Sequence, residues 1–378
     1  MRLILPLLAF GFAILSVAID FAKPAAISKV CLLGFCRFDE LYASADAQGA
    51  DLNNAGALLQ EDPSNPSAWC SYAELLWKRG EAERARSAFA HAVRLGPGMS
   101  PVLMRAANFA FSQDDRKGAL ALSKRILHQT GAFDEVLFSY FQRPGEDVAA
   151  VLTAGLPAEP RAARAWLAWM DRNGTDQDIA VTFAWMKSQG LCDEELAVES
   201  VRLLWDRRAF EAAQTVWGSW VGEGGDDLTR ERLFNGRFER RPTASPLDWK
   251  LEVVPSATMT RHDGVEIHFE GGPHGSISPL HQFATVRAGR YRFAAEIETR
   301  GLSDDARPFF HIFDAEPVRK VDVQTKAVEA DAGRSWLTLD FNVPGGTRAV
   351  EVALEEQASP NSQTGALHVY GMSLVRQE

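Results

Sequence analysis

The chain has 378 residues, of which 46% are hydrophobic and 24% are charged, and its formal net charge is -10. This composition is typical of a folded protein of two or three domains and excludes a chain that is mostly disordered. The excess of acidic residues argues against nucleic acid as a partner, because contact with a phosphate backbone requires clustered Lys and Arg.

An apolar run follows Arg2 and extends from Leu3 to Ile19. As a helix it would be roughly 25 Å long, slightly less than the ~30 Å hydrocarbon core of a membrane. Ser16-Val17-Ala18 also offers a small-x-small cleavage site. Residues 1–22 are therefore predicted to be either a retained membrane anchor or a cleaved signal peptide, and in both cases the rest of the chain is exported.

Residues 23–50 are predicted to link this segment to the first folded domain. Export removes the chain from the reducing cytosol, so Cys31 and Cys36 are expected to form a disulfide across the short loop between them. Cys70 and Cys192 are predicted to be buried small residues and not reactive thiols.

A helical hairpin is predicted after the turn cluster Asp62–Pro66. Apolar residues recur there at intervals of three and four, and Gly80 separates the two helices. When the sequence is aligned with itself at an offset of about 34 residues, Leu103, Ala107 and Ala119 match packing residues of the first hairpin. This match predicts a second hairpin over Ser100–Phe133. Further helices are predicted over 162–170, 178–188, 194–206 and 209–221, so that a helical solenoid spans residues 51–224. The two stripes of the first hairpin are Trp69, Tyr72, Ala73 and Leu76, and Ala85, Ala88, Phe89 and Ala92.

The hairpin residues, together with Pro97, resemble a tetratricopeptide repeat, a family in which stacked hairpins form a groove that binds proteins. The resemblance implies that alternate positions of each first helix line that groove. This sequence shows no group of several basic residues that could bind a carboxylate in the groove. The recognition of a peptide C-terminus, which the chaperone-binding members of the family perform, is therefore not expected of this chain. For Trp77 and Phe111, packing against other helices is the alternative. The implied groove residues are Glu74, Trp77, Lys78, Met104, Asn108 and Phe111.

The composition changes between Gly222 and Asp227, and short segments of alternating apolar and polar residues follow. Residues 290–299 and 336–343 each place four apolar side chains on one face, as half-buried strands do. With five further strands, these segments predict two packed antiparallel sheets over residues 228–378. The further strands are 265–269, 280–286, 309–313, 348–354 and 367–375.

The segment Leu233–Glu239, followed by Asp248-Trp249, resembles the opening of the galactose-binding-like jelly rolls found in carbohydrate-binding modules. Gln282, Ala288–Tyr291 and Val343–Gly346 follow in the order that this group shows. The resemblance implies an antiparallel jelly roll with a possible structural calcium, for which Glu239 is the candidate ligand. The last strand lacks the second carboxylate that such a site needs, so no cofactor is predicted beyond this weak calcium candidate.

Sugar recognition combines an aromatic face with side chains that hydrogen-bond hydroxyl groups. Strand alternation places Trp336 opposite the core residues of its strand, either as an exposed platform or as a seal over the helical domain. The histidines of this half lack the spacing of metal ligands and are expected to be solvated or hydrogen-bonded. The candidate glycan contacts are Trp249, Trp336, Thr338, Asp340 and Tyr370.

The sequence contains no Gly-rich phosphate loop and no nucleophile elbow, so the protein is predicted not to be an enzyme. By resemblance to repeat-plus-jelly-roll proteins of bacterial exopolysaccharide systems, we expect an accessory scaffold at the inner membrane with its bulk in the periplasm. It would bind a protein partner through the groove and a glycan through the jelly roll, in polysaccharide assembly or export. The alternatives are a protein-only adaptor with a structural jelly roll and, from a third class, a polysaccharide hydrolase.

Overall fold

A computed structural model describes residues 52–143, 147–222, 231–271, 276–303, 307–356 and 364–377. The predicted anchor or signal segment, the linker and the expected Cys31–Cys36 disulfide lie outside these residues. No helix within the described ranges is both long enough and apolar enough to cross a membrane.

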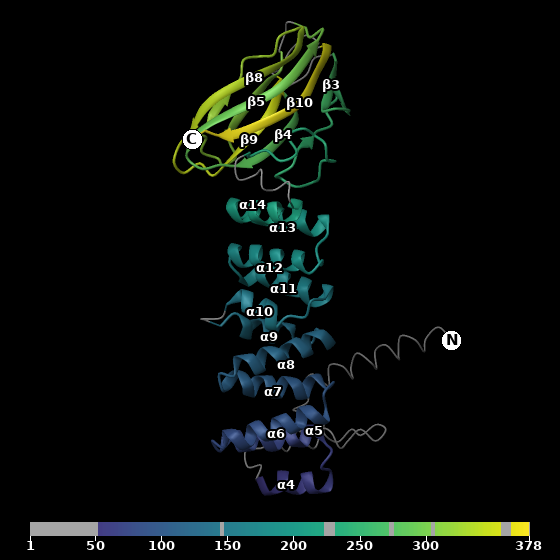
Figure 1. Ribbon diagram of the computed structural model, residues 1–378, viewed down its shortest axis with the longest axis vertical. Coiled ribbons are helices and arrows are strands. Elements are labelled where there is room, and N and C mark those ends of the chain that lie inside the picture. The colour runs from purple at the N-terminus through teal and green to yellow at the C-terminus, as the bar shows by residue number, and fades with distance from the viewer. Residues whose placement is uncertain are drawn as a thin grey trace, which may run out of the picture. The chain divides into compact units, whose positions relative to one another are not determined.

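The described residues form eleven helices followed by ten strands, which confirms the predicted order of a helical part and a β-sandwich (Figure 1). They divide into two compact units. The first contains the residues up to Leu137 together with Thr153–Pro157, and the second contains Phe138–Leu152 and the residues from Ala158 onwards. The last helices thus belong to the same compact unit as the sandwich.

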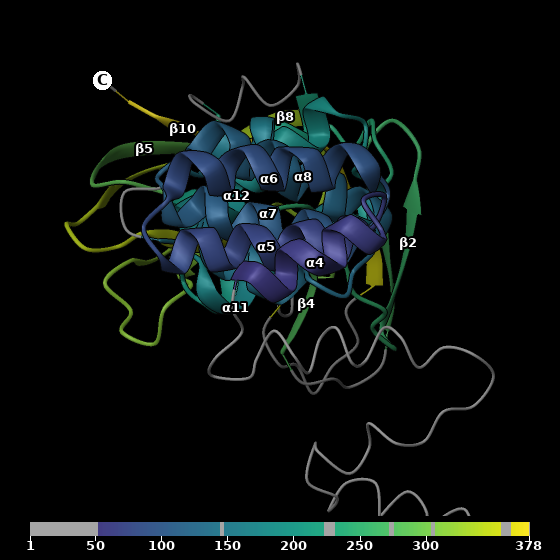
Figure 2. The same ribbon diagram turned by 90° about the horizontal axis from the view of Figure 1, so that it is seen from below.

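The predicted first hairpin is present as α5 and α6, which lie side by side (Figure 2). Asn65 caps α5 by accepting hydrogen bonds from two backbone N–H groups, and Pro66 occupies the first turn, where its missing N–H costs nothing. Gly80 has a φ of 78° in the turn between the helices. Small side chains on both helices allow close approach, since Ala73, Ala85 and Ala92 are all fully buried. The helices with most of their residues in the first unit are α4 (Leu52–Glu61), α5 (Pro66–Lys78), α6 (Ala82–Leu95), α7 (Ser100–Ser112) and α8 (Arg116–Gln129).

Four helices in the second unit match the segments predicted from apolar periodicity. Trp166 is fully buried at their centre, with its ring 5.1 Å from that of Phe138 and its indole N–H donated to Thr182. Two shorter helices, which the periodicity does not indicate, precede them. The remaining helices are α9 (Asp134–Phe141), α10 (Val148–Ala154), α11 (Pro160–Asn173), α12 (Asp176–Ser188), α13 (Glu194–Asp206) and α14 (Phe210–Val221).

Two antiparallel five-stranded sheets form the sandwich. One has the order β1-β4-β9-β6-β7 and the other the order β2-β3-β10-β5-β8, so strands distant in sequence become neighbours. The strands are β1 (Lys250–Leu251), β2 (Ala257–Arg261), β3 (Val265–Glu270), β4 (Ile277–Thr285), β5 (Gly289–Arg300), β6 (Phe309–Asp314), β7 (Asp322–Gln324), β8 (Ala332–Val343), β9 (Ala349–Glu356) and β10 (Thr364–Arg376).

The core between the sheets is built from alternate residues of each strand, and Tyr291, Phe293 and Ala295 of β5 are fully buried in it. Trp249 is only 1% exposed and belongs to this core, where its ring lies 5.3 Å from that of Phe238. The prediction that Trp249 contacts a glycan is therefore wrong. The indole completes the sandwich interior, because its large apolar surface is more stable out of water.

Helices α13 and α14 pack against the sandwich within the second unit. The Trp205 ring lies 5.0 Å from that of Phe283 on β4, and the Trp217 ring lies 5.3 Å from that of Phe234. Around these aromatic contacts, Glu211 accepts two hydrogen bonds from Arg287. The end of the helical array is thus covered by the sandwich, as a terminal repeat of a solenoid requires.

Candidate functional site

A pocket of about 360 Å³ opens between α5 and α7 in the helical part. It contains four of the six residues predicted for the groove, and a fifth residue that the sequence did not single out, Arg105. The lining residues are Glu74, Trp77, Lys78, Arg105 and Asn108.

Glu74 is already engaged by Arg105. The Arg105 Nε and Nη2 atoms lie 2.6 and 2.7 Å from the two carboxylate oxygens, and Nη2 also donates to Ser71 Oγ at 3.0 Å. This bidentate pair joins neighbouring hairpins, and both side chains are largely shielded, at 16% and 31% exposed. Glu74 therefore has a structural role in the array.

The remaining predicted groove residues differ in how accessible they are. Trp77 packs edge-on against Phe109 with 5.6 Å between ring centres, and Lys78 is exposed. Asn108 keeps a buried side-chain oxygen with no hydrogen-bond partner within the described chain. Met104 is only 7% exposed and belongs to the helical core, which corrects its assignment as a contact residue. Phe111 is half-buried and does not line the pocket.

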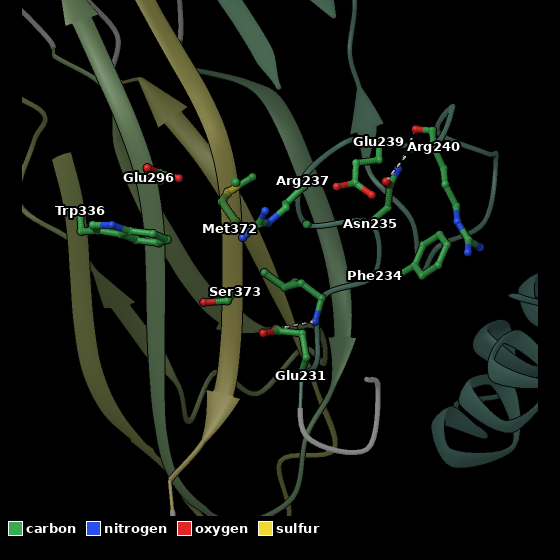
Figure 3. Close-up of a pocket in the computed structure, with 13 residues that line it drawn as sticks. Glu231, Phe234, Asn235, Arg237, Glu239, Arg240, Glu296, Trp336, Met372 and Ser373 are labelled. Atoms are coloured by element: carbon green, nitrogen blue, oxygen red, sulfur yellow. Dashed lines mark hydrogen bonds between the residues drawn. The ribbon is translucent and has the colours of Figure 1, made fainter. Parts of the chain in front are cut away.

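A larger concave site lies on the outer face of the second sheet of the sandwich (Figure 3). It consists of two adjoining pockets, of about 490 and 390 Å³, which share Arg237, Glu239 and Glu296. Trp336 lines the first pocket, and Arg334 and Tyr370 line the second. We call these two pockets together the sandwich site.

The loop of residues 235–240 forms one wall of the sandwich site, and its own backbone holds it in place. Asn235, at a φ of 52°, closes the loop by exchanging two side-chain hydrogen bonds with the backbone of Arg240. The Gly236 carbonyl accepts a hydrogen bond of 2.8 Å from the N–H of Met372 on β10. Arg261 donates to the carbonyls of Phe238 and Arg240, each at 2.7 Å. Arg237 and Glu239 are therefore presented from a fixed backbone.

Trp336 lies on β8, the edge strand of the same sheet, and its side chain is 61% exposed. Thr338 and Asp340 are exposed on the same face of β8. Asp340 is held by Arg292 through two hydrogen bonds of 2.8 Å, which lower the pKa of the Asp340 carboxyl. Neither Thr338 nor Asp340 lines the sandwich site, so of these three residues Trp336 alone reaches it.

Tyr370 borders the site, but its ring is not open to a ligand. The His368 imidazole stacks on it with 4.0 Å between centres, and the Arg334 guanidinium lies 3.9 Å from the ring centre. The imidazole and the guanidinium are both so close to the Tyr370 ring that they cannot fit over the same face, so they lie on opposite faces. The Tyr370 hydroxyl donates to Glu298 at 2.6 Å. The ring faces of Tyr370 are therefore not available to stack on a sugar ring, although Tyr370 lines the site as predicted.

Some charged side chains of the sandwich site are paired with one another, and others are not. Arg334 donates to Glu296 at 2.7 Å and, with a further contribution from Arg237, lowers the pKa of Glu296. By contrast, the side chains of Arg237 and Glu239 make no hydrogen bond or ion pair with any part of the chain that the structure describes. These two opposite charges are thus available to a ligand.

No set of three His, Cys, Asp or Glu side chains among the described residues is grouped as a metal site. Glu239, the candidate calcium ligand, faces the sandwich site. Cys70 is buried as predicted, whereas Cys192 is only partly buried; desolvation raises the pKa of the Cys70 thiol to about 12 and that of Cys192 to about 11, which favours the protonated thiol.

The two histidines on the outer face of the other sheet are paired with carboxylates. His281 lies 2.6 Å from Glu351, and His311 lies 2.6 Å from Asp322. The hydrogen bond to Glu351 raises the pKa of His281 above its usual value.

We expect this pairing to make stability depend on pH. Because the folded-state pKa of His281 is raised, its contribution is fully present below about 6.5, the unfolded pKa, and is lost as the pH rises through the folded pKa. His281→Gln should therefore destabilise the protein more at pH 6 than at pH 9, as measured by denaturant unfolding. For the exposed His262, the same replacement should give a smaller difference in destabilisation between pH 6 and pH 9. A difference equal to that of His281→Gln would contradict the role assigned to His281.

Comparison with family models gives no match, and no curated protein matches the chain. Several solved structures are similar to parts of it, among them the following three. The enzymatically active domain of tailspike protein 4 of bacteriophage CBA120 aligns with 39% of this chain and 21% of its own length, at 11% identity and a TM-score of 0.29. TmCBM61, solved in complex with β-1,4-galactotriose, aligns with 39% of this chain and 99% of its own, at 15% identity and a TM-score of 0.28. YrrB, a TPR protein with an unusual peptide-binding site, aligns with 45% of this chain and 92% of its own, at 13% identity and a TM-score of 0.25.

Proposed function

We propose that this protein is a non-enzymatic accessory protein of a bacterial envelope that binds a glycan through the sandwich site and a protein partner through the helical groove. The observation that carries the glycan part is the exposed Trp336 ring beside the unpaired Arg237 and Glu239 side chains. An aromatic face beside fixed polar groups is the arrangement that binds the apolar side and the hydroxyl groups of a sugar ring.

The helical pocket supports the second binding role. Trp77 and Lys78 line it, and the buried Asn108 oxygen has no partner within the described chain. An unpaired buried acceptor costs free energy, which a ligand N–H can recover. A peptide segment of a partner protein supplies such groups along its backbone.

The environment of Glu296 suits binding better than hydrolysis. A glycosidase requires a carboxyl whose pKa is raised so that it can donate a proton to the leaving group. Glu296 has the opposite environment, because Arg334 lowers its pKa and stabilises the carboxylate. Turnover of a polysaccharide, lost in Glu296→Gln, would contradict the non-enzymatic proposal.

Polysaccharide assembly or export is the setting that we propose, with residues 1–22 holding the chain at the inner membrane and its bulk in the periplasm. The proposed attachment to the membrane rests on the apolar N-terminal sequence. Fractionation of cells and the mass of the mature protein test it. An intact N-terminus in the membrane fraction is the expected result, and a cytoplasmic protein would overturn the proposal.

The test of glycan binding is Trp336→Ala in the full chain, measured by calorimetric titration against a panel of oligosaccharides. Loss of the stacking surface should weaken binding by about tenfold or more, equivalent to about 1.4 kcal/mol. Thr338→Ala is the control, since Thr338 is exposed on the same strand but lines neither pocket. Equal affinities for the two variants would place the glycan elsewhere.

A protein-only adaptor is the second candidate function, and the contacts of α13 and α14 with the sandwich favour it. The sandwich covers the end of the helical array, and this role needs no sugar. No affinity for any glycan, together with a partner protein crosslinked through a probe at Lys78, would support this candidate over the first.

A further inference from the structure

We infer that the ligand of the sandwich site is a neutral oligosaccharide of at least two sugar units, and not an acidic polysaccharide. The inference rests on the proposed glycan-binding function and specifies its ligand. It is carried by the balance of charges in the site, by the two charges left unpaired, and by the distance that the site spans.

The charges that line the sandwich site balance. The cationic side chains that line the two pockets are arginines, and they are equal in number to the carboxylates. His262 also lines the site. A site selective for a polyanion would carry an excess of cationic groups, as phosphate-binding surfaces do. The protein as a whole, at a formal charge of -10, also repels polyanions. The arginines are Arg237, Arg240, Arg261 and Arg334, and the carboxylates are Glu231, Glu239, Asp263 and Glu296.

Most of these charges are engaged in holding the site together. Arg261 and Arg240 donate to backbone carbonyls, and Glu231 accepts a hydrogen bond of 2.6 Å from the N–H of Leu374. Arg334 and Glu296 are paired with each other. These groups fix the walls of the site and have less capacity left for a ligand.

Arg237 and Glu239 remain, and they carry opposite charges on the same loop (Figure 3). A guanidinium offers only donors and a carboxylate only acceptors. A sugar hydroxyl both donates and accepts, so neighbouring hydroxyls of a neutral ring satisfy both side chains. The carboxylate of a uronic acid would pair with Arg237 but would be repelled by Glu239 and Glu296, and desolvating it would cost further free energy.

The site is too wide for one sugar unit to engage both ends. Trp336 of β8 is paired in register with Glu296 of β5, and β5 lies between β8 and β10. At about 4.8 Å between neighbouring strands, the backbone of Trp336 is about 10 Å from that of β10, and the loop with Arg237 and Glu239 lies against β10. A ring stacked on Trp336 lies in the first pocket, so at least one linked unit is needed to occupy the second pocket, which Arg334 and Tyr370 line.

The experiment titrates the full chain with neutral gluco-, galacto- and manno-oligosaccharides of one to four units, and with oligouronates of equal length. We expect affinity for at least one neutral series to rise by about tenfold or more from one unit to two or three, and no oligouronate to bind more tightly. Arg237→Gln and Glu239→Gln should each weaken neutral binding by about tenfold, the value of one good hydrogen bond to a charged group.

Matched controls are Arg292→Gln and Asp340→Asn, a charged pair on the outer face of the same sheet that lines neither pocket. They should leave affinity unchanged. Tighter binding of oligouronates, or equal binding of mono- and oligosaccharides, would overturn the inference while leaving a glycan-binding protein. Failure of the folded protein to bind any saccharide would overturn the proposed glycan function as well.

Discussion

Replacement of Trp217 by alanine is expected to lower the free energy of unfolding by about 3–5 kcal/mol. Trp217 is 1% exposed on α14, and its ring packs edge-on against Phe234 of the sandwich. The truncation removes a large buried apolar surface and leaves a cavity where helices and sandwich meet within the second unit. Chemical denaturation followed by circular dichroism measures the loss.

Trp217→Phe distinguishes loss of packing from loss of the indole N–H. The Trp217 Nε1 atom is buried without a hydrogen-bond partner in the described structure, so phenylalanine keeps much of the apolar contact and sacrifices no hydrogen bond. Its cost should be well below that of alanine. Trp336→Ala, at a residue 61% exposed, should change stability by less than about 0.5 kcal/mol. Equal losses for Trp217→Ala and Trp336→Ala would contradict the packing of α14 on the sandwich.

The second large effect is expected from Gly236→Ala. A Cβ at Gly236 would collide with the backbone carbonyl of Met372, which β10 holds in place through the pairing of Met372 with Ala295 of β5. The loop of residues 235–240 must then shift, which should cost about 1–3 kcal/mol of stability. Since Arg237 and Glu239 move with it, glycan affinity should fall by about tenfold or more, as both hydrogen-bonding groups are displaced.

Gly333→Ala is the matched control, because a Cβ at Gly333 meets no atom within 4 Å and the residue lies on β8 near Trp336. It should leave stability and affinity nearly unchanged. Thermal unfolding of both variants measures their stability, and titration measures their affinity for the glycan. A Gly236→Ala protein that binds as tightly as the unchanged chain would show that the loop does not form the site.

Local periodicity predicted the longer elements well. The stripes around Trp69 and Phe89 lie within helices of 13 and 14 residues, and α5 and α6 form where they indicate. The short helices α9 and α10, of 8 and 7 residues, were missed, because so few turns give no measurable period. Strands β1 and β7, of 2 and 3 residues, were missed for the same reason, and the five-residue strand β2 was missed as well.

Side-chain roles were harder to predict than elements. Trp249 and Trp336 are both tryptophans beside polar residues in the sequence, yet one is 1% and the other 61% exposed. For Trp336, alternation within β8 sets the outward face. Trp249 lies just before the two-residue strand β1, where alternation gives no guide, and the loop packing that buries it depends on residues far along the chain.

The amino-acid sequence by itself determined the order of helices and strands and the outward side of β8, because both depend on interactions between residues a few positions apart. Only the tertiary structure decided that Arg237 and Glu239 stand unpaired near Glu296 and Trp336, and that Tyr370 is covered on both faces. These arrangements depend on which strands become neighbours in the sheet, and strand pairing joins residues that are far apart in the sequence, such as Arg300 of β5 and Ala366 of β10.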